Sequence, residues 1–159
     1  MKNALIAATV ACAAMLSAII TVRAQTAPAA PMPTVSMDGT HSDALYRTFG
    51  EKPGLVKLMD DFMTRLVADP VTGPFFGPAN QTRIKAELVD QFCQLMGGPC
   101  TYTGVDMKTI HASLGINKAD FNALVEELQH AMDDQGIPFR DQNKLLALLA
   151  PMHRVIITQ

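Results

Sequence analysis

The sequence predicts an all-α fold, built as a single domain that begins near residue 43 of the 159-residue chain. Two observations support this prediction. From residue 43 onward, apolar side chains recur at helical spacing, and no convincing stretch alternates with a period of two. Clusters of glycine and proline separate the apolar stretches, as they do between consecutive helices. With 48% hydrophobic and 18% charged residues, the chain has enough apolar material for one core.

The N-terminal part of the chain has a different character. Lys2 precedes an apolar run that extends to Val22 and ends in small or apolar residues before Gln25, as in a secretory signal peptide. We therefore expect residues 1–24 to be a signal peptide and residues 25–42 to be a disordered tether rich in proline and alanine. An uncleaved membrane anchor remains the alternative, because the apolar run is nearly long enough to cross a bilayer.

The export signal predicts a periplasmic or secreted protein. Cleavage would remove Lys2 and Arg23 and no acidic residue, so the net charge would fall from −2 to about −4. This mildly acidic balance gives no indication of a surface that binds nucleic acid. Contact with a membrane is expected only if the N-terminal segment stays uncleaved.

Four principal helices are expected in residues 43–159. The first carries one apolar stripe from Leu55 to Leu66 and ends before Pro70. Residues 71–80 follow; they contain two glycines and two prolines and are expected to form a loop. The second helix runs from about residue 82 to residue 96, where two glycines and a proline end it.

A short helical segment is expected at residues 105–114, before the last two principal helices. The third principal helix starts at a capping box formed by Asn117 and Asp120. Pro138 suits the first turn of the fourth. The stretch between the second and third principal helices is long and irregular, which is unusual in a compact domain unless something is bound there.

Of the four histidines, only His111 lies within an apolar stripe. That position suits either a core histidine bonded to a backbone carbonyl or a ligand of iron or zinc. As a ligand, the imidazole needs a hydrogen-bond partner for its second nitrogen, and the carbonyl of Met107 lies one turn earlier. The pattern Cys-x-x-Cys-His is absent, which excludes a covalently attached c-type haem.

Residues 43–158 resemble the group 1 truncated haemoglobins, which are short bacterial globins with a two-over-two helical sandwich around a haem. No single motif is decisive, but the ordered set at its spacing is specific. The motifs are Leu45-Tyr46-Arg47-Thr48-Phe49-Gly50, Ala68-Asp69-Pro70, Phe75-Phe76, Gly97-Gly98-Pro99, Tyr102-Thr103-Gly104, Met107-Lys108, His111, Gly115-Ile116, Phe121 and Leu149-Ala150-Pro151.

The resemblance implies that His111 is the proximal iron ligand of a non-covalently held haem b. It also implies that the haem pocket is lined by Phe76, Tyr102, Met107, Ile116 and Phe121. The implied function is reversible binding of small diatomic gases (oxygen, nitric oxide or carbon monoxide), as in an oxygen-binding protein or carrier. The alternative is a haem redox protein, either an electron carrier with a donor partner or an enzyme that removes nitric oxide or peroxide.

The sequence departs from the family on the distal side of the haem. The family often has tyrosine where Met63 stands and glutamine where Leu88 stands, and Ile84 is apolar as well. Bound oxygen carries partial negative charge that a hydrogen-bond donor stabilises, so we expect this pocket to stabilise it less than the family norm. Gln91 is either a replacement donor or a residue that reaches out at the haem edge to bond with the backbone. Met63 is either apolar filler or an axial ligand.

Cys93 and Cys100 flank the glycine–proline turn. In an exported protein, an even pair around a sharp turn predicts a disulfide, with two free thiols as the alternative. Such a bond would close a short loop where the segment leading to His111 begins. Helical geometry puts Cys93 about half a turn from Ile84, on the outer face of its helix.

Overall fold

A computed structural model describes residues 42–159 of the chain. The signal peptide expected at residues 1–24 and almost all of the tether expected at residues 25–42 lie outside these described residues. Within them the all-α prediction is confirmed, since they contain helices and no strand. In chain order the helices are α1 (Ala44–Thr48), α2 (Glu51–Ala68), α3 (Gly73–Phe76), α4 (Gln81–Leu95), α5 (Met107–His111), α6 (Lys118–Asp134), α7 (Phe139–Leu149), the 3-10 helix η1 (Ala150–Met152) and α8 (His153–Ile156).

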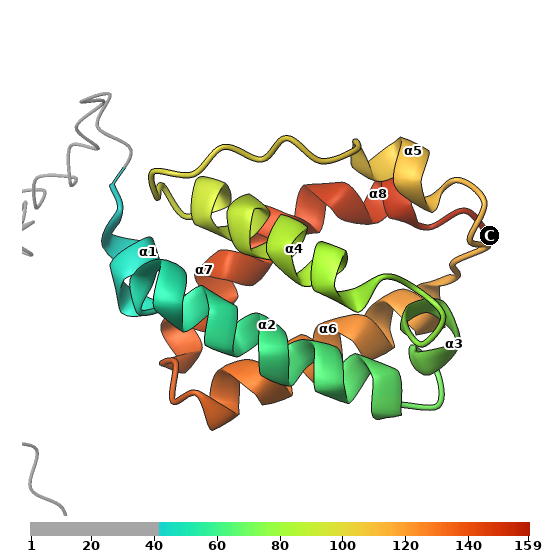
Figure 1. The fold of residues 1–159 in the computed structure, drawn as a ribbon, viewed down its shortest axis with the longest axis horizontal. Coiled ribbons are helices and arrows are strands. Elements are labelled where there is room, and N and C mark those ends of the chain that lie inside the picture. Colours follow the sequence, from blue (N-terminus) through green and yellow to red (C-terminus); the bar gives the residue numbers. More distant parts are fainter. Residues whose placement is uncertain (1–41) are drawn as a thin grey trace, which may run out of the picture. The chain divides into compact units, whose positions relative to one another are not determined.

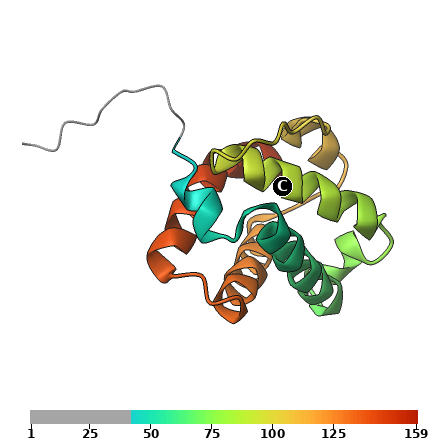
Figure 2. The same cartoon turned by 60° about the vertical axis from the view of Figure 1, so that its left-hand side comes forward.

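The four long helices α2, α4, α6 and α7 form the predicted two-over-two sandwich (Figure 1). Helix α2 lies in contact with both α4 and α6, and α7 packs against α6 and the short α1. The turned view shows α2 and α6 running side by side, with α4 crossing above them (Figure 2). Fully buried side chains where these helices meet form the core; they are Phe49, Leu55, Leu58, Met59, Leu66, Met96, Leu128, Met132 and Leu145. Among the described helices, none combines the length and apolarity needed to cross a membrane.

Side-chain caps define where the helices around the candidate site begin. The side chain of Asn80 accepts a hydrogen bond from the backbone N–H of Arg83 at the start of α4. The capping box predicted at Asn117 and Asp120 is confirmed, because each side chain accepts a bond from the other residue's backbone N–H. These caps satisfy N–H groups that lack partners within the helix. The helix starts therefore agree closely with the sequence.

Residues 71–80 are not the plain loop that their glycines and prolines predict, since they contain α3. The carboxylate of Asp69 accepts hydrogen bonds from the backbone N–H groups of Val71 (2.9 Å) and Thr72 (2.8 Å). The buried hydroxyl of Thr72 donates to the carbonyl of Leu66 at 2.7 Å. These contacts tie the segment back to α2, and Pro74 suits the first turn of the short helix that follows.

Residues 96–106 connect α4 to α5 without a helix of their own. The segment turns at the end of α4 and runs back above it to α5 (Figure 1). Helix α5 is shorter than the stretch 105–114 that the apolar spacing predicts, and it ends at His111. The irregular middle expected from the sequence is therefore present, and it passes over one side of a cavity.

Candidate cofactor cavity

A cavity of about 640 Å³ lies within the sandwich, between α4, α5, α6 and the C-terminal helices. This volume is typical of sites that bind small molecules or cofactors, for which roughly 300–1,000 Å³ is usual. Its walls are mostly apolar, with a few polar groups. The apolar lining residues include Phe62, Leu66, Phe75, Phe76, Phe92, Ile116, Phe121, Leu124, Leu146, Leu149 and Ile156.

The structure brings nearly all of the proposed site residues to this cavity. Its walls include His111 and the five residues expected around a haem, namely Phe76, Tyr102, Met107, Ile116 and Phe121. They also include the distal candidates Ile84, Leu88 and Gln91. The chain positions of these residues span six segments of the fold, so only tertiary structure could bring them together.

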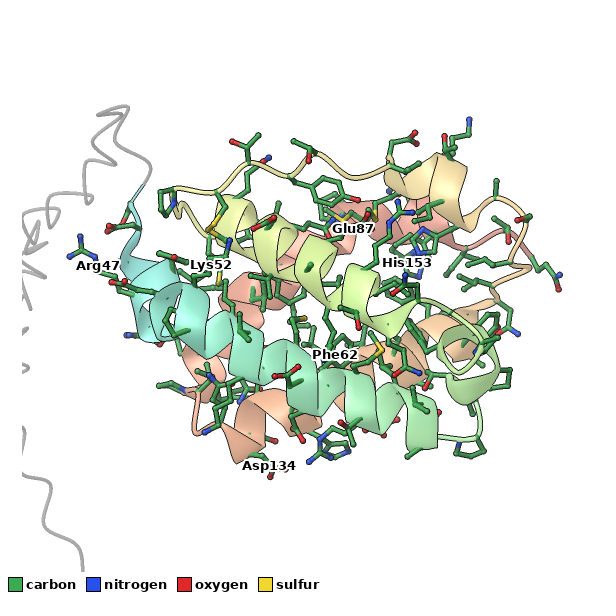
Figure 3. All side chains as sticks on the ribbon, in the orientation of Figure 1. Arg47, Lys52, Phe62, Glu87, Asp134 and His153 are labelled. Atoms are coloured by element: carbon green, nitrogen blue, oxygen red, sulfur yellow. A yellow bond between two sulfur atoms is a disulfide. The ribbon has the colours of Figure 1, made fainter. Side chains whose placement is uncertain are left out.

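Met63 is the one residue proposed for the haem pocket or its distal side that is not among those lining the cavity. Its side chain is buried in α2, with an exposed fraction of 3%. The preceding residue, Phe62, reaches the cavity instead, and Figure 3 shows it directed from α2 into the interior. This placement agrees with apolar filler and lends no support to Met63 as an axial ligand.

Several lining residues were not singled out by the sequence. Phe62, Leu66 and Phe92 line the cavity together with Leu124, Leu146 and Ile156. Their signal in the sequence is the apolar helical stripe, which cannot separate a side chain that packs on protein from one that faces a cavity. Phe75, by contrast, belongs to the motif Phe75-Phe76, and adjacent aromatic residues are unusual in a solvated loop.

His111 is half-buried at the end of α5, and its ring is oriented by the helix that carries it. The Nδ1 atom lies 2.7 Å from the carbonyl oxygen of Met107. Because a carbonyl can only accept a hydrogen bond, Nδ1 carries the proton. The lone pair is then on Nε2, which makes Nε2 the nitrogen able to bind a metal.

Helix α5 is held at its start by Asp106. The Asp106 carboxylate accepts a hydrogen bond from the backbone N–H of Thr109 at 2.9 Å. The hydroxyl and then the backbone N–H of Thr109 lower the pKa of Asp106 below its ordinary value. The cap therefore stays ionised and in place at neutral pH.

Gln91 is buried, with an exposed fraction of 7%, and its amide points at sulfur atoms. Its Nε2 atom lies 3.7 Å from Sδ of Met107 and 3.5 Å from Sδ of Met152. The expected alternative, an amide that reaches out to bond with the backbone, is not what the structure has. A thioether is a weak acceptor, so these contacts orient the amide without strongly satisfying it.

The polar residues of the cavity include two acids, Glu87 and Asp120. Glu87 is paired with Arg83 on the same helix, with Nε and Oε1 2.8 Å apart, and it extends from α4 in Figure 3. Burial, followed by the charges of Glu87 and Asp106, raises the pKa of Tyr102. The Tyr102 hydroxyl stays protonated and donates a hydrogen bond to the carbonyl of Val105 at 2.8 Å.

Cys93 and Cys100 are joined by a disulfide, with their Cα atoms 5.7 Å apart. The expectation that Cys93 lies on an outer face is wrong, because its side chain is fully buried within the core. Cys93 lies about half a turn from Ile84 on α4, and its side chain therefore points away from the cavity. However, that side of α4 is covered by Tyr46 of α1 and by the turn at Gly98.

The other described histidines do not line the cavity. His130 is exposed on α6, as its position off the apolar face predicts. His153 is half-buried and meets the ring of Phe121 edge-on, with centroids 4.8 Å apart. Residues 42–159 contain no cluster of three or more histidine, cysteine or acidic side chains suited to a metal ion.

Comparison with known proteins identifies relatives by sequence. Residues 44–158 match the family model described as bacterial-like globin. The chain is 30% identical over 115 residues to the group 1 truncated haemoglobin GlbN of Mycolicibacterium paratuberculosis, covering 72% of this chain and 85% of that protein. It is 29% identical over 112 residues to a group 1 truncated haemoglobin of Chlamydomonas moewusii, covering 67% and 64% of the two chains.

Solved structures share the fold at lower sequence identity. The truncated haemoglobin of Tetrahymena pyriformis in its Fe(III) form superposes with a TM-score of 0.69 at 19% identity, covering 72% of this chain and 98% of that one. The 2/2 haemoglobin of Synechococcus sp. PCC 7002, in the cyanomet state with covalently attached haem, gives a TM-score of 0.67 at 16% identity, with the same coverage.

Proposed function

The chain belongs to the bacterial-like globin family, and from this premise we propose that it binds haem through His111 and reversibly takes up a small diatomic gas. Membership of this family supports haem-based gas binding in general. The proposal adds the ligand, His111, and the gases oxygen, nitric oxide and carbon monoxide. One observation carries it: a large apolar cavity includes in its wall a histidine whose Nδ1 is bonded to the carbonyl of Met107, so that Nε2 is left to bind iron.

The residues present suit a porphyrin. Aromatic and aliphatic walls match its apolar ring, and burial of that ring supplies much of the binding energy. Haem supplies the iron at which the gas binds. The protein contributes an oriented imidazole from His111 and an apolar pocket beside Ile84 and Leu88.

We propose a pocket that holds oxygen loosely. Two side chains that line the cavity at distal positions, Ile84 and Leu88, have no hydrogen-bond donor. A bound gas with partial negative charge then loses a stabilising hydrogen bond, worth about 0.5–1.5 kcal/mol. Carbon monoxide is less polar when bound and loses less. A high preference for carbon monoxide over oxygen follows from this arrangement.

We propose that the haem is of the b type and held without a covalent bond. The two cysteines of the described residues are joined to each other, so neither thiol is free to attach a porphyrin. The neighbour from Synechococcus has covalently attached haem, so attachment is a point to test. Extraction of the loaded protein with acidified butanone should remove all haem. Retained haem would overturn the proposal.

A redox function is the second candidate, with an electron donor as partner. A redox protein would accept electrons from a donor and then turn over nitric oxide or peroxide. A simple gas carrier would do neither. The expected location, periplasmic or secreted, is likewise a proposal. It predicts that fractionation finds a mature chain whose N-terminus is residue 25.

The direct test uses the full-length protein expressed with haem. It should show a strong Soret band and a ferrous spectrum that shifts on adding carbon monoxide. His111→Ala should lose the iron-bound spectrum, whereas His130→Ala, which changes an exposed histidine, should keep it. A wild-type protein that takes up no haem would overturn the proposed function. A full, unchanged ligand spectrum in His111→Ala would overturn the assignment of the ligand.

A further inference from the structure

The helix that carries His111 has little packing of its own. Among the described helices, α5 packs substantially only against the short α8. Met107 and His111 are half-buried, while the three residues between them are exposed. So few buried contacts contribute little stability locally. The position of His111 therefore depends on the chain at either end of α5.

On its N-terminal side, α5 follows the connecting segment 96–106, of which residues 101–106 have few attachments to the rest of the fold. The backbone N–H of Tyr102 donates to Oε1 of Gln94 at 2.6 Å, but Gln94 is exposed. Water competes for such a bond, so its net contribution is small. Gln91 adds only a weak contact to the sulfur of Met107. These polar contacts alone hold the segment loosely.

The strong attachment is at the start of the segment, where Cys100 is bonded to Cys93. Cys93 is fully buried in the core, and Cys100 packs against the same core. Between them, a Cβ added at Gly98 would lie 2.7 Å from the sulfur of Cys93 and 2.9 Å from the ring of Tyr46. The turn is thus pressed against α1 and α4, and the disulfide makes that attachment covalent.

We propose that the Cys93–Cys100 disulfide positions His111, by anchoring the start of the segment that carries it, and thereby sets how slowly haem leaves. The inference rests on the proposed haem function. A cross-link removes conformations from any state in which its loop has opened, so it disfavours opening. Without the disulfide, residues 101–106 can open together with α5, and the bond from His111 to iron breaks more often. We expect haem loss to accelerate about tenfold.

The experiment measures transfer of ferric haem from the full chain to excess apomyoglobin. It compares oxidised wild-type protein, wild-type protein reduced with a phosphine, and the double variant Cys93→Ala, Cys100→Ser. Reduction adds two electrons and two protons to the two sulfurs, while the phosphine takes an oxygen from water and becomes its oxide. It leaves every side chain in place, so it controls for the packing lost in the variant. Thr103→Ala, an exposed change in the same segment, is the matched control.

Two further readouts separate positioning from general stability. The iron–histidine stretching band of the ferrous protein, seen by resonance Raman, should shift or broaden when the disulfide is reduced. It should return to its original position when the disulfide is reoxidised. Amide hydrogen exchange should accelerate at residues 101–111 and stay unchanged in α2 and α6. Thr103→Ala should match the wild type in every measurement.

Unchanged haem loss in reduced protein and in the double variant would overturn the proposal. Equal acceleration of exchange in all helices would overturn it as well, since the bond would then act on the whole fold. If oxidised protein takes up no haem, the proposed function fails. Exchange at residues 101–111 of the haem-free protein still decides whether the disulfide anchors this segment.

Discussion

The Nε2 atom of Gln91 lies 3.5 Å from the Sδ atom of Met152, although the two residues are 61 positions apart in the sequence. The same nitrogen lies 3.7 Å from the sulfur of Met107, on the helix that carries His111. One buried amide thus connects α4 with α5 and with η1. Because the amide is directed at these two sulfurs, the structure argues against Gln91 as a donor to a bound gas.

Gln91→Leu should therefore leave the oxygen dissociation rate within about threefold of the wild-type value. The physical reason is that the amide contacts thioethers in place of the gas. Stopped-flow displacement of oxygen by carbon monoxide measures the rate. A tenfold or greater acceleration of oxygen release in this variant would show that the amide does reach the bound gas.

Leu88→Gln should slow oxygen release by about tenfold, because it places an amide donor in the wall of an otherwise apolar pocket. Leu88 is half-buried and lines the cavity, so the longer side chain has space to enter. Leu88→Met, similar in size but without a donor, is the control and should release oxygen at nearly the wild-type rate. Carbon monoxide release should change little in either variant. If Leu88→Gln and Leu88→Met behave alike, the apolar-pocket explanation is wrong.

Met63→Leu should leave the ferric and ferrous absorption spectra unchanged, because Met63 is buried outside the cavity wall. The two side chains have similar volumes, so we expect a loss of stability below about 1.5 kcal/mol. Absorption spectra with and without carbon monoxide make the comparison. Loss of a six-coordinate ferrous spectrum on this substitution would instead identify the sulfur as an axial ligand.

Asp106→Ala should increase the rate of haem loss at neutral pH, because it removes the cap of the helix that carries His111. Asp106→Asn, a good cap without charge, should lose haem at a rate between those of the wild type and Asp106→Ala. The hydrogen bonds from Thr109 lower the pKa of Asp106 below its ordinary value of 3.8. The contribution of its charge is therefore present above pH 3.8 and is lost as the pH falls through the lower folded-state pKa.

The haem-loss rate of Asp106→Ala divided by that of the wild type should thus be largest near neutral pH. In strong acid this ratio should fall towards one. Haem transfer measured across pH checks this, with Asp106→Asn as the reference that lacks a titrating group. A ratio that stays constant down to strong acid would exclude a role for the ionised carboxylate.

The fold class, one helix start and the candidate iron ligand of this protein could be predicted from local sequence. Helical spacing predicted the all-α class, and the capping box at Asn117 and Asp120 located the start of α6. The ordered motifs identified the family, now shown by the match over residues 44–158. His111 stood out, and the structure has the expected partner at Met107, because both lie on one helical turn. Signals of this kind act over a few residues and do not depend on the remainder of the fold.

Other features depended on which helix faces meet. Sequence placed Cys93 on an outer face, yet α1 and the turn at Gly98 cover it. It left Gln91 open between two roles, and the structure has its amide against the sulfurs of Met107 and Met152. Periodicity shows on which side of a helix a side chain lies. Whether that side chain is buried depends on a surface from another part of the chain that packs against it. Only the packing of distant segments decides whether that side meets solvent, core or cavity.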